Sequence, residues 1–395
     1  MDFRLSQDQA AAREMAIDFA RKEVTPHWRR REAEGIFHRD LIEKMGAAGM
    51  FGCLFPEEYG GTGMGFVAQV LVMEEMMRAS IESGMPFNNQ GVNVPMAVYR
   101  HGTLEQKRRY VPELIAGRTI GCFALTEPGG GSDAAAMRTR AVRRGDRYII
   151  NGSKMWITLG SVADLILLFA KTDPDAGHAG VSAFLVETRN LKGFSARPIE
   201  ADIGTRCIPT AELSFQDVEI PAESLLGGEG QGFSLAMGTL HFGRVCVPAR
   251  GLGIAQACLD MAVQYANDRV AFGKKIGEFQ AVQHTIADML AQTEAARWLI
   301  YRAADKAERG ETFGREASIA KYFAGEAVMN VTEKCLEIHG GFGFAREFPV
   351  FRYFTCARVL RTGEGSANIQ KNLLGMDELG WKKIDRHAAG VSRNE

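Results

Sequence analysis

The segment RTGEGSANIQ, residues 361–370, places one carboxylate, Glu364, between Gly363 and Gly365. Two interpretations fit this pattern. In the first it starts a helix: Gly363 ends the preceding element, Glu364 complements the positive end of the helix dipole, and Ser366 caps the helix. In the second Glu364 is a reactive base, and the glycines leave room for a large flat group to approach. The segment alone favours the helix start.

A glycine-rich segment, ALTEPGGGSD at residues 124–133, raises a similar choice. Pro128 fixes φ, the glycines permit positive φ, and Ser132 or Asp133 can cap the next element, so a simple loop explains it. The same loop could present backbone N–H groups to a phosphate or a flavin edge. A Rossmann dinucleotide site is not expected in this chain, because neither GxGxxG nor a P-loop occurs.

Four further features allow either a structural or a ligand-binding interpretation. Trp156 and Thr158 fall on one face of a predicted strand, where they either join the core or form a wall for a flat aromatic ligand. Arg269 and Phe272 lie in a predicted turn between helices. The glycines of EIHGGFGFAREFP, residues 337–349, are typical of a helix stop. Arg244, near the start of a long predicted helix, is either half of an ion pair or an anchor for an acidic group.

Several classes of chemistry are disfavoured by composition. The charge balance of 47 Lys plus Arg against 48 Asp plus Glu gives no basic field for nucleic acid or an anionic membrane. The seven cysteines are scattered without a CxxC pair, which predicts reduced thiols, and no HExxH occurs, so we expect no metal. A serine nucleophile lacks its GxSxG motif.

The elements that must position these residues occur in the order helical, β, helical. Helical periodicity occupies residues 1–120, beginning with Ser6 and Gln9 in capping-box spacing. Short β-rich runs occupy residues 121–232, and without helix-length crossovers they predict an antiparallel sheet. Long helical periodicity returns over residues 233–395, ending in a polar tail, DRHAAGVSRNE. No apolar run reaches the ~18 residues of a membrane span, and the N-terminus lacks a targeting pattern, which predicts a cytoplasmic protein.

Taken together, ALTEPGGGSD, NGSKMWIT, DRVAFGKKIGEFQA, HGGFGFAREFP and GEGSANIQ resemble the acyl-CoA dehydrogenase family in order and spacing over nearly the whole chain. The resemblance implies an α+β fold with an N-terminal helical domain, a middle antiparallel β-domain and a C-terminal four-helix bundle. It further implies bound FAD, a homotetramer, and an electron-transfer flavoprotein as partner.

The resemblance also implies residue roles. Within one subunit the flavin would be lined by Leu125, Thr126, Ser132, Trp156 and Thr158. Across a subunit interface the nucleotide part would contact Arg269, Phe272, Gln280, Glu337 and Gly341. The site would be completed by Ser366 and Asn368, and the substrate would be held by contacts with Ser132, Arg244, Gly363 and Gly365.

Glu364 falls where the family's catalytic base stands, which favours the second interpretation of its segment. Removing the weakly acidic α-proton of a thioester needs an aligned carboxylate and a polarised carbonyl, together with hydride departure from the β-carbon. In some members the base lies near the Arg244 position instead, but that region reads TLHFGR, without a carboxylate. The chain departs from the family pattern in two places. Thr355-Cys356 replaces a common Arg-Asp, and Glu337 replaces a common Gln.

The predicted reaction is therefore oxidation of an acyl-CoA to its trans-2-enoyl-CoA. Gly363 replaces a common Tyr, as in isovaleryl-specific relatives, which predicts an acyl group that is branched, cyclic or aromatic-substituted near the thioester. If Phe87 or Phe242 refills that space, a straight short or medium chain is expected instead. The alternatives from other classes are a flavin oxidase or monooxygenase and a DNA-associated relative.

Overall fold

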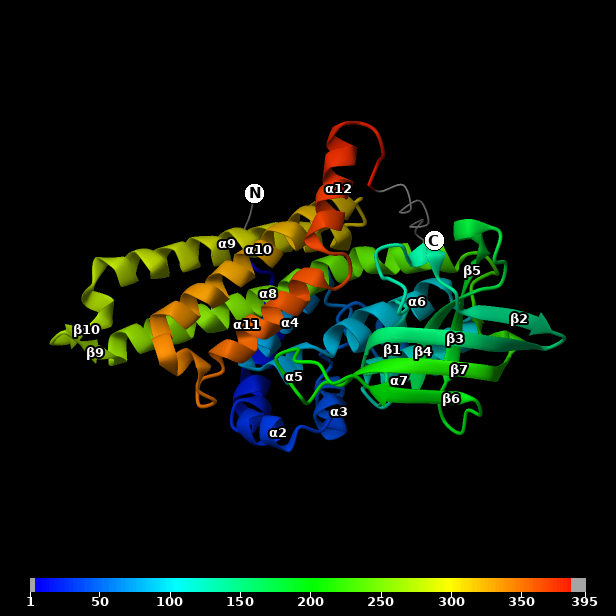
Figure 1. Cartoon of the computed structure of the whole chain (residues 1–395), viewed down its shortest axis with the longest axis horizontal. Coiled ribbons are helices and arrows are strands. Elements are labelled where there is room, and N and C mark those ends of the chain that lie inside the picture. The colour runs from blue at the N-terminus through cyan, green and yellow to red at the C-terminus, as the bar shows by residue number, and fades with distance from the viewer. Residues whose placement is uncertain (1–3, 385–395) are drawn as a thin grey trace.

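The computed structural model describes residues 4–384 of the chain, and the predicted polar tail lies outside them. Seven α-helices form the N-terminal region (Figure 1): α1 (Gln7–Phe19), α2 (Trp28–Glu34), α3 (Arg39–Ala47), α4 (Phe66–Ala79), α5 (Ile81–Gly84), α6 (Val94–His101) and α7 (Leu104–Ile115). The capping box at α1 is confirmed, since Ser6 Oγ accepts from the Gln9 N–H and Gln9 Oε1 accepts from the Ser6 N–H. Helix α4 is buried along most of its length.

Two π-helical segments interrupt this region, η1 (Ala20–Val24) and η3 (Asn88–Asn93). All six residues of η3 are buried, and four of them carry side-chain amides. Pro95 lies at the start of α6, directly after this segment. Because proline has no N–H, it cannot donate to the carbonyl four residues earlier, and this favours a local departure from α-helical geometry.

The middle region is one sheet built from eight strands: β1 (Gly121–Ala124), β2 (Arg140–Arg144), β3 (Arg147–Thr158), β4 (Leu165–Lys171), β5 (Val181–Glu187), β6 (Phe194–Pro198), β7 (Thr210–Pro221) and β8 (Leu225–Leu226). Their order is β6-β7-β3-β2-β4-β5-β8, with β1 on β4. The expectation of a wholly antiparallel sheet needs correction, because β1 and β2 both pair parallel with β4. Strand β3 runs opposite to β2, and β4 then runs in the same direction as β1 and β2.

Strand β3 is continuous through two short β-rich runs of the sequence, RYIING and KMWIT. Its pairing with β7 shifts register between Lys154 and Ile157, and Trp156 there has a φ of 62°. This bulge turns the Trp156 side chain outward, leaving 55% of the residue exposed.

The C-terminal region contains α8 (Gly232–Asp268), α9 (Gln280–Glu308), α10 (Gly314–His339), α11 (Val350–Thr362) and α12 (Ala367–Glu378). A two-stranded hairpin of β9 (Val270–Ala271) and β10 (Lys274–Lys275) joins α8 to α9 at the far end of the bundle from the sheet (Figure 1). Arg244 lies well inside α8 rather than near a helix start, because the helix begins at Gly232 and continues through Pro248.

Short 3-10 turns complete the described chain: η2 (Glu57–Tyr59), η4 (Ala134–Ala136), η5 (Gly177–Gly180), η6 (Ala222–Ser224), η7 (Ile276–Glu278) and η8 (Gly340–Phe344). Asp133 precedes η4 without a side-chain capping bond. The seven cysteines are buried free thiols, as predicted. Within residues 4–384 no helix is both long and apolar enough to cross a membrane.

Candidate active site

Glu364 lies in the sharp turn between α11 and α12. Gly363 ends α11, as predicted, and Ser366 occupies the cap position of α12 but makes no side-chain capping bond. Glu364 has a φ of 56° and Gly365 one of 100°. A left-handed glutamate costs on the order of 1 kcal/mol and persists only where the surroundings enforce it. The turn therefore serves more than helix initiation.

The carboxylate of Glu364 is held on one oxygen and unpartnered on the other. Asn88 and Asn93, both in η3, donate their side-chain N–H groups to Oε1, the latter at 3.0 Å. Oε2 is buried and has no hydrogen-bond partner within the described chain. The hydrogen-bonding capacity of Oε2 is therefore unused within the described chain, as a general base requires.

Gly243 of α8 borders that second oxygen. A Cβ atom built on Gly243 would lie 1.7 Å from Oε2 of Glu364, so only glycine leaves room for the carboxylate there. The segment TLHFGR, which has no carboxylate of its own, thus packs directly against the one at Glu364.

Buried cations surround this carboxylate. Burial lowers the pKa of the Arg244 guanidinium, whereas Glu364 opposes that shift; Arg244 Nε has no partner in residues 4–384. Burial likewise lowers the pKa of Lys321 to about 8, again opposed by Glu364, and its Nζ donates to the Leu360 carbonyl at 2.7 Å. Arg250 donates to the Met85 carbonyl at 3.1 Å. These charges favour negative charge developing beside Glu364.

The predicted flavin wall is assembled from two segments of the sheet. Thr126 lies just after β1, and its carbonyl accepts from the Met155 N–H at 2.9 Å, which joins it to the strand carrying Trp156 and Thr158. Leu125 is buried, whereas Ser132 is exposed in the glycine-rich loop. An exposed indole beside a half-buried hydroxyl fits the flat, polar-edged ring system of a flavin.

Glu127, in the same motif, has a structural role that its sequence pattern does not indicate. Its carboxylate accepts from Lys154 Nζ at 2.8 Å and from the Thr139 hydroxyl at 2.6 Å. Burial raises the pKa of the Glu127 carboxyl, but Lys154 and the hydrogen bonds from Thr139 and the Arg138 N–H together bring it below its ordinary value. This buried pair fixes the loop against β3.

Segment η3 connects Glu364 to the predicted flavin wall. While Asn88 contacts Glu364, its neighbour Asn89 donates to the Thr158 carbonyl at 3.1 Å. Consecutive residues therefore fix the two parts of the site relative to each other. No motif predicts a role for these asparagines, although three Asn and one Gln within NNQGVN, before a proline, are a detectable signal.

The residues predicted to bind the nucleotide part of FAD form a separate, exposed group. Arg269 lies over the Phe342 ring at 5.6 Å, and Phe272 is 96% exposed at the hairpin tip. The other members of this group are also exposed: Gln280, Glu337 and Gly341. Figure 1 shows the hairpin at the opposite end of the bundle from β3, so one chain does not bring this group to its own Trp156. At the start of α12, Ser366 is half-buried and Asn368 exposed.

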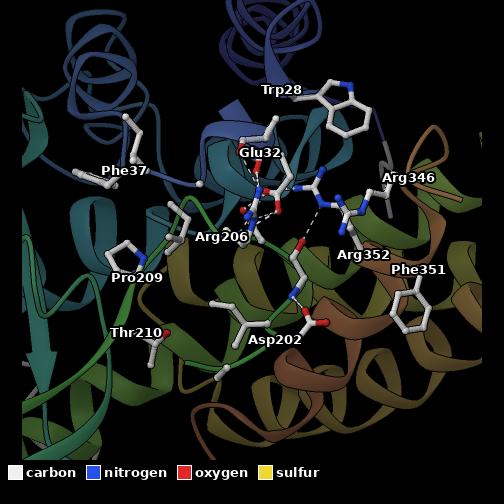
Figure 2. A pocket seen from close by; sticks show the side chains of 18 of the residues that line it. Trp28, Glu32, Phe37, Asp202, Arg206, Pro209, Thr210, Arg346, Phe351 and Arg352 are labelled. Atoms are coloured by element: carbon white, nitrogen blue, oxygen red, sulfur yellow. Dashed lines mark hydrogen bonds and ion pairs between the residues drawn. The ribbon is translucent and has the colours of Figure 1, made fainter. Parts of the chain in front are cut away.

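A cavity of about 1200 Å³ adjoins the flavin wall (Figure 2). It includes Thr210, the register partner of Thr158, but none of the predicted site residues. Figure 2 shows Glu32 at its centre, where it accepts from Arg352 at 3.0 Å and from the Thr205 hydroxyl at 2.8 Å. The lining holds arginines and carboxylates in equal number, and Glu32 already pairs with Arg206 and Arg352, so the cavity has no excess of positive charge.

Fold and site together define a flavin-dependent oxidoreductase. Residues 6–118, 122–218 and 230–379 match the N-terminal, middle and C-terminal domains of acyl-CoA dehydrogenase, respectively. The chain belongs to the acyl-CoA dehydrogenase family, whose members depend on FAD and act on CH–CH groups.

Similar proteins cover almost the whole chain. An acyl-CoA dehydrogenase of Bacillus subtilis (strain 168) is 41% identical over 95% of this chain and 99% of its own length. A 3-(aryl)acrylate reductase of Clostridium sporogenes (strain ATCC 15579) is 38% identical over 93% of this chain and 97% of its own. The structure of butyryl-CoA dehydrogenase from Megasphaera elsdenii superposes with a TM-score of 0.93 at 38% identity, covering 96% of this chain and all of that one.

Proposed function

We propose that this enzyme oxidises an acyl-CoA, branched, cyclic or aromatic-substituted near the thioester, to the trans-2-enoyl-CoA and passes the electrons to an electron-transfer flavoprotein. In this proposal Oε2 of Glu364 takes the α-proton, and the backbone N–H of Glu364 polarises the thioester carbonyl. The buried cations stabilise the developing enolate. FAD, when bound, supplies the acceptor for the β-hydride.

We assign FAD contacts to the flavin wall and, across a subunit interface of a homotetramer, to the exposed group around Phe272. This assignment explains why the two groups lie far apart within one chain. We also propose the domain division 1–120, 121–232 and 233–395.

The open space beside Gly363 carries the substrate proposal. A Cβ atom at Gly363 would meet only the Val359 carbonyl, at 3.7 Å. Phe87 packs on Phe51 at 4.9 Å between ring centroids, and Phe242 packs on Phe313 at 5.3 Å. Both rings are therefore engaged elsewhere, and the exposed surface beside Gly363 leaves room for a substituent on the acyl group. The aryl substrate in the name of the Clostridium relative agrees with this proposal.

The test compares kcat/KM for butyryl-CoA with that for branched and ring-bearing acyl-CoA esters, in the parent and in Gly363→Tyr. We expect the parent to prefer the substituted esters, and the Tyr variant to lose that preference by tenfold or more. The competing proposal, a straight short chain, is favoured by the Megasphaera structure. A parent that prefers butyryl-CoA, with no change in Gly363→Tyr, would establish it. Hydrogen peroxide formed in stoichiometric amount during turnover would instead indicate an oxidase.

A further inference from the structure

Two asparagine amides converge on the catalytic carboxylate from a segment far away in the sequence. Asn88 and Asn93 are 5% and 2% exposed, and each donates to the same oxygen, Oε1 of Glu364. Amide N–H groups, rather than the amide oxygens, must face a carboxylate, because only the N–H groups can donate. Both Oδ1 atoms remain buried without partners in the described chain. Two buried acceptors left unsatisfied are costly, which indicates that the contact with Glu364 has a purpose beyond stability.

The π-helical geometry makes this convergence possible. In an α-helix residues five apart differ by about 140° around the axis and face different directions. A π-helix, closed by bonds between residues five apart, brings such positions closer to one face. Segment η3 therefore lets Asn88 and Asn93 reach one oxygen together. Single π turns occur frequently at functional sites.

We propose that Asn88 and Asn93 are positioning residues that hold Oε1 of Glu364, so that Oε2 faces the α-proton of the substrate. The inference rests on the proposed role of Glu364 as the base. The two donors prevent rotation of the carboxylate toward Arg244, where an ion pair would occupy Oε2.

Other charged and titratable groups face the same carboxylate, and they are common to the parent and every variant. Helix α8 contributes Arg244, Cys246 and Arg250, and α10 contributes Lys321. Two residues of α11 lie next to these groups: Cys356 beside Arg250, and Arg361 beside Lys321. The asparagine variants leave these groups in place, so a change in proton transfer would follow from the lost amides.

The variants are Asn88→Leu and Asn93→Leu, which keep a similar volume and remove the donor. Gln90→Leu is the matched control. Gln90 is a fully buried amide in the same segment, but it donates to the carbonyls of Leu114 and Thr119 and accepts from the Gly121 N–H, without contact to Glu364. It reports the cost of losing a buried amide by itself.

The readout is deuterium uptake at the α-carbon of acetyl-CoA in D₂O, measured by mass spectrometry on the FAD-loaded enzyme. Acetyl-CoA has no β-carbon, so uptake measures proton abstraction without oxidation. We expect uptake to fall about tenfold in each asparagine variant, and kcat for the best acyl-CoA to fall by a similar factor while KM stays within about twofold of the parent value. Per folded enzyme, Gln90→Leu should show neither change.

The outcomes separate the two proposals. If Glu364→Gln retains uptake, the assignment of the base fails. If Glu364→Gln abolishes uptake while both asparagine variants keep parental uptake and parental kcat, the positioning role fails alone. Should the leucine variants not fold, Asn88→Ala and Asn93→Ala decide instead, and parental deuterium uptake in both would overturn the inference.

Discussion

Substituting alanine for Gly243 should separate catalysis from folding. The added Cβ would lie 1.7 Å from Oε2 of Glu364, whereas an ordinary contact needs about 3.5 Å. The oxygen must therefore retreat by about 1.8 Å. A displacement of about 1 Å can cost 10²-fold in rate, so we expect kcat to fall by at least about 10²-fold.

Folding should be affected little by the same change. The atom that the methyl group meets is the end of a flexible side chain, and alanine inside a helix is more favourable than glycine by about 1 kcal/mol. The melting temperature should remain within a few degrees of the parent value, and the flavin absorbance should be retained.

Gly251→Ala is the control on the same helix. Its Cβ would meet Val328 Cγ1 at 3.6 Å, an ordinary contact. Both variants are assayed by kcat with an artificial electron acceptor and by thermal unfolding. A Gly243→Ala enzyme with kcat within about threefold of the parent would refute the proposed position of the carboxylate, as would an equal loss in Gly251→Ala.

Three further predictions concern the base, the assembly and a buried lysine. Glu364→Gln should stay folded and yellow but lose about 10²–10⁴-fold in kcat, and activity within tenfold of the parent would contradict its role. Phe272→Ala should lose FAD and assembly together, measured by flavin content and light scattering; a monomer holding stoichiometric FAD would contradict a cross-subunit site. Burial lowers the pKa of Lys321 from 10.5 to about 8. Between these two pH values the side chain of Lys321 is protonated more fully in the unfolded chain than in the folded one. Lys321 therefore makes the free energy of unfolding rise with pH over that range. Urea unfolding at pH 7.5 and 9.5 should show a smaller rise in Lys321→Met.

Local sequence signals predicted the parts of the fold that local physics determines. The capping box at Ser6 and Gln9 formed as expected, because its partners are three residues apart. The β-rich runs became strands, but β1 is too short to stand out, and its parallel pairing with β4 depends on a register set by the whole sheet. The bulge at Trp156 is equally a product of pairing with β7.

The candidate site likewise contains residues that local sequence predicts and residues that only the folded chain brings together. Motif positions such as Glu364 and Trp156 could be named from sequence because their segments are distinctive. The partners of Glu364 could not, because Asn88 and Asn93 are 276 and 271 residues away and meet it only through packing of η3 against the α11–α12 turn. Nor could the sequence show that Gly243 faces Oε2.

The three glycines Gly363, Gly365 and Gly243 stand around one glutamate for different physical reasons. Gly365 has a φ of 100°, which lets the chain turn, and Gly243 is the surface against which the carboxylate packs. Gly363 has an ordinary φ of −61° and no close neighbour, so neither backbone strain nor packing requires glycine there. The proposed substituted acyl group, if it lies beside Gly363, would explain the absence of a side chain there.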